Sequence, residues 1–331
     1  MLKKRTIEQT AHWLLLTFGL ILFGLLIQRV GTKQLAGLFG RAEKGYWIAG
    51  IAVYFMSMLC RAFKWHMLIT SGYLVTMKQF LPVYLFNAYL GNITPFKSGE
   101  AAGPVLFKRY FSVEIGQGFS IILIDRIIEL IWMLIFLFTG FFYIWANLSV
   151  PALISRAILL GSVVTVLLVL LLLSILFIEG FPVITFLMTH IGQPRFQKFL
   201  DRVRNELQHF YDYRKRTPLR SLMTALNGLT ASAFLMQFVA VWLVVISLIP
   251  VRFLDSLASQ AIAIPISILS FIPAGIGIAA LGYQSLMSLF GYTAGPVISA
   301  ALISKVLFLG LIFICGGISS LFLRRRGRVL S

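Results

Sequence analysis

Three charged side chains lie inside one of the most apolar stretches of the sequence, between Ile121 and Ile131. Asp125 and Glu129 are four residues apart and Arg126 lies three before Glu129, so a helix would place all three on one face. A charge at the centre of a membrane helix costs about 2.5–3.5 kcal/mol, so the trio is not expected to face lipid. Two interpretations remain open. The trio is either an internal ion-pair network that only locks helices together, or part of a polar cavity that binds a charged group of a substrate.

A second polar segment, residues 87–103, is flanked by apolar sequence on both sides. It carries four side chains that could contact a ligand, together with a proline and a glycine that interrupt a helix: Asn87, Asn92, Lys97, Glu100, Pro95 and Gly99. Irregular backbone persists at membrane depth only where protein or a water-filled cavity satisfies it. We therefore expect a broken or re-entrant helix pair over residues 80–112, with its polar groups turned inward. Glu100 is expected near a helix N-terminus or paired with Lys97 or Arg126.

A weaker copy of this segment follows about half a chain later, where Pro273, Gly275 and Gly277 interrupt an apolar region. Both copies fit the pattern P-x-x-x-G-x-A-A, and Pro95 and Pro273 are 178 residues apart. The match predicts a second broken or re-entrant pair over residues 254–290. The alternative is a chance match in a sequence that is rich in glycine and alanine.

Lys305 is the only charged residue between positions 297 and 322. The repeat offset places it opposite Arg126 or Ile127, so one basic residue from each half could approach a common axis and line a central cavity there. The alternative is a lysine whose charged end reaches the membrane surface while its stem stays in the apolar layer.

The composition indicates an integral membrane protein. Of 331 residues, 59% are hydrophobic and only 12% are charged, far from the balance of soluble domains. The net charge of +18 would fit a nucleic-acid partner in a soluble protein, but here most basic residues lie between apolar runs. The two cysteines and four histidines are scattered, so neither a disulfide framework nor a metal site is expected, and no cofactor.

Apolar runs of about 20 residues are long enough to cross a bilayer. Six such spans are predicted, at about residues 13–27, 46–69, 119–144, 158–178, 222–249 and 297–322. With both termini cytoplasmic, 21 of the 29 Lys and Arg residues fall on the cytoplasmic side and six on the other, as the positive-inside rule favours. Arg61 and Lys64, near the inner end of the second span, are counted among the 21. The sequence therefore predicts an all-α, multi-pass protein of the cell (cytoplasmic) membrane.

The six spans and two broken pairs divide into two halves, residues 1–150 and 151–331, that would enter the membrane in opposite senses. Such an inverted-topology repeat is typical of transporters, with the binding site near the repeat interface. A basic connector at residues 190–220 has the spacing of an amphipathic helix at the membrane surface. It is either an ordinary cytoplasmic connector or a segment that binds anionic lipid.

Taken in order, the motifs Asn92-x-x-Pro95-x-Lys97-x-Gly99-Glu100, Asp125-Arg126-x-x-Glu129 and Pro273-Ala274-Gly275-Ile276-Gly277 resemble the membrane domain of lysylphosphatidylglycerol synthases. The resemblance covers about residues 10 to 325. It implies a domain that moves or binds a lipid, while a separate soluble domain, not expected here, performs aminoacyl transfer. The chain departs from the family pattern at Ala280, where an acid is usual, and at Gly103, where an arginine is common.

These observations favour a flippase-like transporter of a lipid with an anionic head group, such as a phospholipid or a polyprenyl-phosphate-linked sugar. Arg126 and Lys305 would attract a phosphate, and the three acids would hold these cations in place or carry protons. The broken pairs would supply helix N-termini and flexible gates. An integral-membrane lipid-linked transferase is the alternative, although the sequence has no catalytic constellation, so a non-enzymatic role is favoured. A non-catalytic subunit that serves a separate synthase or transferase also stays open, as does a homodimer.

Overall fold

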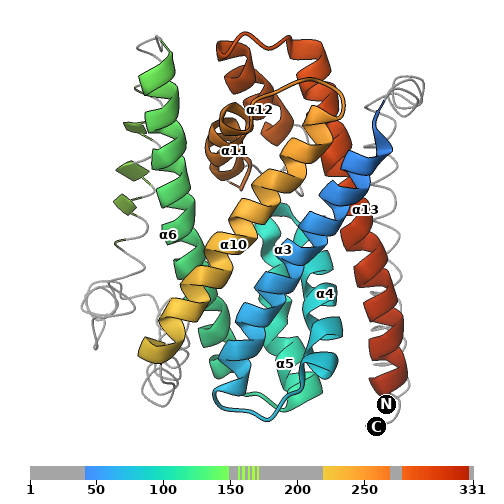
Figure 1. Ribbon diagram of the computed structural model, residues 1–331. Helices are drawn as coiled ribbons and strands as arrows, with labels where there is room; N and C mark the ends of the chain where they lie inside the picture. Colours follow the sequence, from blue (N-terminus) through green and yellow to red (C-terminus); the bar gives the residue numbers. More distant parts are fainter. Residues whose placement is uncertain are drawn as a thin grey trace, which may run out of the picture.

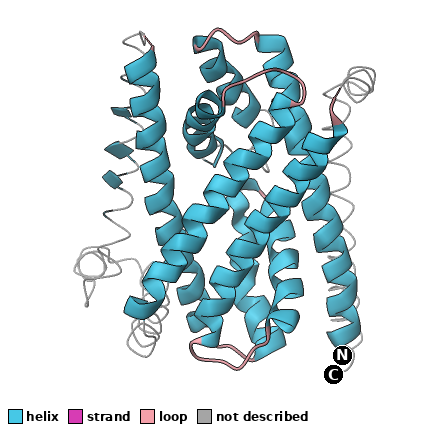
Figure 2. Cartoon of the chain, viewed as in Figure 1, coloured by secondary structure: helices cyan, strands magenta, loops and turns pink. Residues whose placement is uncertain are grey.

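The computed structural model describes residues 42–148, 219–268 and 278–327, together with a few helical positions between 156 and 170. Its regular elements there are all helices (Figure 2). In chain order they are α3 (Lys44–Thr70), α4 (Met77–Ile93), the 3₁₀ helix η1 (Pro95–Ala102), α5 (Gly103–Phe111), α6 (Ile115–Asn147), α10 (Leu219–Ile246), α11 (Phe253–Ile268), α12 (Ile278–Leu289) and α13 (Ala294–Gly327).

Three of the described helices are long and apolar enough to cross a membrane: α3, α10 and α13. They contain the spans predicted at 46–69 and 297–322 and most of the one at 222–249. The span predicted at 119–144 lies within α6, a single helix of 33 residues. The other two spans and the basic connector at 190–220 lie wholly or largely outside the described residues. The all-helical membrane class is therefore confirmed, and the total of six spans stays a prediction.

The chain is broken where the polar segment predicts a break. Thr94 is extended (φ −108°, ψ 147°), as the residue before a proline tends to be, and it separates α4 from η1. The backbone N–H of Gly99 donates a 2.6 Å hydrogen bond to Thr94 Oγ1. A side chain at Gly99 would overlap the carbonyl of Leu90, so only glycine permits this close approach. The second break, predicted at Pro273, Gly275 and Gly277, falls on residues 269–277, which lie outside the described residues.

The two broken helix pairs lie at opposite ends of the bundle (Figure 1). The turns that flank α4, η1 and α5, at residues 71–76 and 112–114, are both at the lower end of the view. The turns that flank α11 and α12, at 247–252 and 290–293, are both at the upper end. Each pair therefore enters and leaves the bundle at the same end.

The central contact is made by α3 and α10, which run side by side through the middle of the bundle (Figure 1). A Cβ at Gly50 would lie only 3.0 Å from the carbonyl oxygen of Ala240, which shows how closely the two backbones approach. The indole Nε1 of Trp47 donates to Ser247 Oγ (2.7 Å), and the hydroxyl of Ser57 donates to the carbonyl of Ala233 (2.8 Å).

Each of the other long helices packs against the broken pair from the opposite part of the chain. A Cβ at Gly140 of α6 would lie 2.9 Å from the carbonyl oxygen of Ala258 on α11. Gly316 of α13 packs directly on Tyr89 of α4, and a Cβ there would overlap the Tyr89 side chain. The N-terminal and C-terminal helices are therefore interlocked rather than stacked as two separate bundles.

We expect Gly316→Ala to destabilise the protein, because the added methyl group forces α13 away from α4. The cost should be about 1–3 kcal/mol, the usual range for overpacking a close contact. Gly317→Ala is the matched control, since a Cβ at the next position meets nothing within 4 Å. Thermal unfolding in detergent measures both variants, and equal unfolding temperatures would contradict the packing of α13 on α4.

Candidate functional site

Six charged side chains from three elements form one ion cluster within the helix bundle. Arg61 and Lys64 come from α3, Glu100 from η1, and Asp125, Arg126 and Glu129 from α6. The cluster contains three basic and three acidic side chains, so its formal charges cancel.

The ion pairs run through every member of the cluster. Lys64 Nζ lies 2.6 Å from Asp125 Oδ1 and 3.6 Å from Glu129 Oε1, and Arg61 also pairs with Glu129. The Arg126 guanidinium lies 2.7 Å from Glu100 Oε2, 3.1 Å from Asp125 Oδ2 and 2.9 Å from Glu129 Oε2. Lys64 and Asp125 have no solvent-exposed surface, so their mutual pairing is what makes their burial tolerable.

The predicted pairing of Arg126 with Glu129 and with Glu100 is confirmed by these distances. Arg61 and Lys64, predicted near the inner end of the second span, lie in the second half of α3, and their pairing with the acids of α6 was not predicted. One signal in the sequence could have revealed them. Three acids and one arginine leave two negative charges, and Arg61 and Lys64 stand three residues apart on an otherwise apolar helix.

The other candidate ligand-contacting residues of the polar segment are Asn87, Asn92 and Lys97. Asn87 is buried close to Gly103, and its Oδ1 has no hydrogen-bond partner among the described residues. Asn92 donates from Nδ2 to the carbonyl of Ala88 (2.8 Å). The side chain of Lys97 lies outside the described part of the chain.

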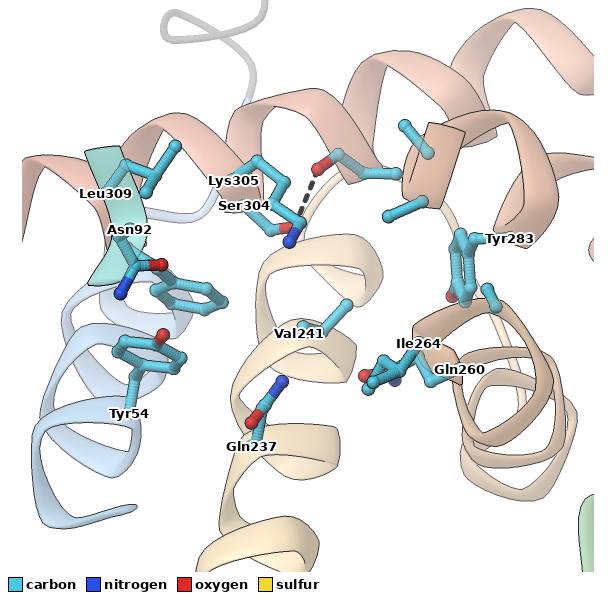
Figure 3. Close-up of a pocket in the computed structure, with 15 residues that line it drawn as sticks. Tyr54, Asn92, Gln237, Val241, Gln260, Ile264, Tyr283, Ser304, Lys305 and Leu309 are labelled. Carbon is cyan, nitrogen blue, oxygen red and sulfur yellow. Dashed lines mark hydrogen bonds between the residues drawn. The ribbon is translucent and has the colours of Figure 1, made fainter. Parts of the chain in front are cut away.

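A cavity lies beside the ion cluster, among α3, α4, α10, α11, α12 and α13 (Figure 3). Its polar lining residues come from six helices: Tyr54, Asn92, Gln237, Gln260, Tyr283, Ser304 and Lys305.

Lys305 is the charged residue among the described residues that line this cavity. The expectation that Arg126 lines the same cavity is not met there, because its guanidinium is held by three carboxylates of the ion cluster. Sequence reasoning did not single out Gln237 or Gln260. Their uncharged side chains give no signal in an apolar helix until the fold brings them to one space.

Gln237 connects the ion cluster to the cavity. Its Oε1 accepts a 3.1 Å hydrogen bond from Arg61 Nη2, while the same side chain lines the cavity. The guanidinium of Arg61 also lies 5.0 Å from the centre of the Phe234 ring, a cation–π contact on the same helix as Gln237. The charged cluster therefore sits one side chain away from any molecule in the cavity.

The family model for the lysylphosphatidylglycerol synthase TM region matches residues 13–316. The chain belongs to this family. It is also 23% identical over 337 residues to a UPF0104 membrane protein of Pyrococcus horikoshii, with 96% of this chain and 98% of that relative covered. Of the two positions at which the chain departs from the family pattern, Ala280 lines the cavity and Gly103 begins α5 beside Asn87.

No group of three His, Cys, Asp or Glu side chains with the arrangement of a metal site occurs in the described ranges. A further acid that sequence reasoning missed, Asp255, is buried at the far end of the bundle. It accepts hydrogen bonds from the hydroxyls of Tyr143 (2.7 Å) and Tyr292 (2.8 Å), which ties the turn at 290–293 to α6 and α11. Partial burial raises the pKa of Tyr292, and the hydrogen bond to Asp255 acts in the same direction.

We expect Lys64→Met to destabilise the protein by about 3–5 kcal/mol, because it leaves the buried Asp125 with one cation fewer. The double variant Lys64→Met/Asp125→Leu should regain most of this loss, since it restores a neutral cluster. Lys108→Met, at an exposed position on α5, is the matched control for loss of a lysine. Thermal unfolding in detergent measures all three, and a Lys64→Met protein as stable as the control would contradict the buried pairing.

Proposed function

We propose that this protein is a flippase-like membrane transporter for a lipid with an anionic head group. The observation that carries the proposal is the cavity inside an apolar helix bundle, with Lys305 as the charged residue among its described lining. Water is scarce at such a site, so an ammonium group attracts a lipid phosphate more strongly there than at a surface. Family membership supports a lipid cargo in general, because the family's name refers to a phospholipid.

We further infer an inverted-topology repeat, with the cavity at the meeting of its halves. The order of a long helix, a broken pair and a second long helix occurs twice, as α3 to α6 and as α10 to α13. Corresponding helices begin 175, 176, 175 and 179 residues apart, close to the 178-residue offset of the P-x-x-x-G-x-A-A pattern. The positions of the broken pairs at opposite ends of the bundle support opposite insertion (Figure 1).

In this proposal the parts have separate tasks. Lys305 holds the phosphate of the lipid head, and the apolar walls between the helices accept the start of the acyl or prenyl chains. The ion cluster holds α3, η1 and α6 together, and through Gln237 it fixes one wall of the cavity. The broken pairs, each entered from its own side, open the cavity to one membrane face at a time.

The topology can be tested by cysteine accessibility in intact cells. After Cys60 and Cys315 are replaced by alanine, cysteines are introduced singly at Leu74 and Ala294, which are exposed at opposite ends of the bundle. With cytoplasmic termini, we expect a membrane-impermeant thiol reagent to label Ala294→Cys in intact cells and Leu74→Cys only after lysis. Labelling of both from the same side would contradict the inverted repeat.

Transport can be tested with purified protein in proteoliposomes that contain a fluorescent phosphatidylglycerol. We expect wild-type protein to move the lipid between leaflets and Lys305→Met to slow it at least about tenfold, which corresponds to about 1.4 kcal/mol of lost interaction. Lys44→Met, at an exposed position, is the matched control. Thermal unfolding shows whether Lys305→Met is folded.

Two results would contradict the proposal. One is a folded Lys305→Met protein that moves lipid at the wild-type rate. The other is wild-type protein that converts the lipid to a new chemical species, detected by mass spectrometry, which would favour a membrane-bound transferase.

A further inference from the structure

Gln237 and Gln260 project from α10 and α11 toward the same space below Lys305 (Figure 3). The hydrogen bonds at the far side of each amide determine which atom it presents to the cavity. The hydrogen-bond donors and acceptors that a ligand meets in the cavity are therefore set by these two amides as well as by Lys305.

The orientation of Gln237 is fixed by Arg61. A guanidinium can only donate hydrogen bonds, so the atom that it contacts at 3.1 Å must be the amide oxygen. The NH₂ group of Gln237 is then the part of the amide available to the cavity. Gln237 therefore presents a hydrogen-bond donor to the cavity that Lys305 also lines.

Gln260 is oriented in the opposite way. Its Nε2 donates to the carbonyl of Phe238 (3.2 Å) and to Ser256 Oγ (3.1 Å), and a carbonyl oxygen can only accept. Its Oε1 is therefore the remaining atom. This oxygen is buried, since Gln260 is 4% exposed, and it has no hydrogen-bond partner among the described residues. A buried acceptor without a protein partner is costly, so a bound molecule that donates to it gains a hydrogen bond that the protein does not supply.

Asn92 contributes a second acceptor. Its Nδ2 is bonded to the carbonyl of Ala88, which leaves its oxygen for the cavity. The ring of Tyr54 stacks on that of Phe308 with a centroid distance of 4.2 Å, and this flat apolar wall lies beside Asn92 (Figure 3). The cavity therefore combines a cation, an amide donor, two amide acceptors and an aromatic wall.

A ligand that matches this set has a phosphate flanked by groups that donate hydrogen bonds without carrying positive charge. Hydroxyl groups have this property, because each can donate to an amide oxygen and accept from an amide NH₂. An ammonium group could also donate to Gln260 and Asn92, but its charge would be buried near Lys305. No carboxylate occurs among the described lining residues to offset it, since Glu100, Asp125 and Glu129 are all paired with cations of the ion cluster.

From this arrangement we infer that the cavity selects lipids whose phosphate bears an uncharged polyhydroxyl head, a glycerol or a sugar, and discriminates against heads that carry an amine. The inference rests on the proposed function, because it describes the cargo of the same cavity. Gln260 is the residue that distinguishes hydroxyl-bearing heads, and Lys305 is the residue that holds the phosphate of every anionic lipid.

Equilibrium binding to the purified full-length chain tests this selectivity without requiring transport. Four lipids are compared in detergent micelles by displacement of a fluorescent phosphatidylglycerol. Phosphatidylglycerol and a polyprenyl phosphate with one uncharged sugar carry the hydroxyl-bearing heads, and their relative affinities distinguish glycerol from sugar as the preferred source. Phosphatidylmethanol has the same phosphodiester charge without hydroxyls, and phosphatidylethanolamine carries an ammonium group.

We expect at least one hydroxyl-bearing lipid to bind about tenfold more tightly than phosphatidylmethanol, the difference that one good hydrogen bond can supply. Phosphatidylethanolamine should bind more weakly than any of the three anionic lipids. Gln260→Met should lower affinity for the hydroxyl-bearing lipids to that of phosphatidylmethanol and leave phosphatidylmethanol itself unchanged. Leu254→Met, at an exposed position of the same helix, is the matched control.

If Gln260→Met fails to fold, Asn92→Leu tests the second acceptor with the same four lipids. Equal binding of phosphatidylethanolamine and phosphatidylglycerol, or unchanged selectivity in a folded variant, would overturn the inference. The outcome is separable from that of the proposed function. Selective binding without lipid movement in proteoliposomes would contradict the flippase proposal and support the head-group inference. Lipid movement without head-group selectivity would support the flippase proposal and contradict the head-group inference.

Discussion

The cost of placing charge in an apolar bundle governs how this protein is built. Lys64 and Asp125 are fully buried, and each is tolerable only because the other lies 2.6 Å away. That pair joins α3 to α6, and Arg126 extends the cluster to Glu100 on η1. These three elements are thereby held in one arrangement. Since removal of a single partner leaves an uncompensated charge, the cluster constrains all three elements together.

Close backbone contacts at glycine residues also hold the helices together. Gly50, Gly140 and Gly316 each bring a long helix against a helix from the other part of the chain, at distances that leave little room for a larger side chain. In a membrane the apolar surface of helices is matched by lipid, so small residues and interhelical polar contacts supply much of the association. The same close contacts leave a space among α3, α4, α10, α11, α12 and α13, where Lys305 and the amides of Gln237 and Gln260 gather.

The separation of the ion cluster from the cavity has a functional consequence. The acids of the cluster are occupied by their own cations, so Lys305 acts on the cavity without a described carboxylate in the lining. Gln237 is the contact between the two, bonded to Arg61 on one side and open to the cavity on the other. In the proposed transporter, a stable charged framework fixes the position of one wall, while α11 and α12 on the other side of the cavity are joined through a break rich in proline and glycine.

The sequence by itself determined the membrane class, the positions of α3, α10 and α13, the break at Pro95 to Gly99 and the pairing of Arg126 with Glu129. Each of these follows from short-range properties: hydropathy over about 20 residues, the backbone limits of proline and glycine, and neighbours on one helix face. Only the tertiary structure decided that Arg61 and Lys64 complete the cluster, and that Lys305 and Arg126 occupy different sites. It also decided which atoms the cavity presents. From the sequence alone, Gln260 could turn either its oxygen or its NH₂ group toward the cavity. The Phe238 carbonyl and Ser256 Oγ both accept from its nitrogen, which leaves the oxygen, and these two acceptors come together only when α10 packs against α11.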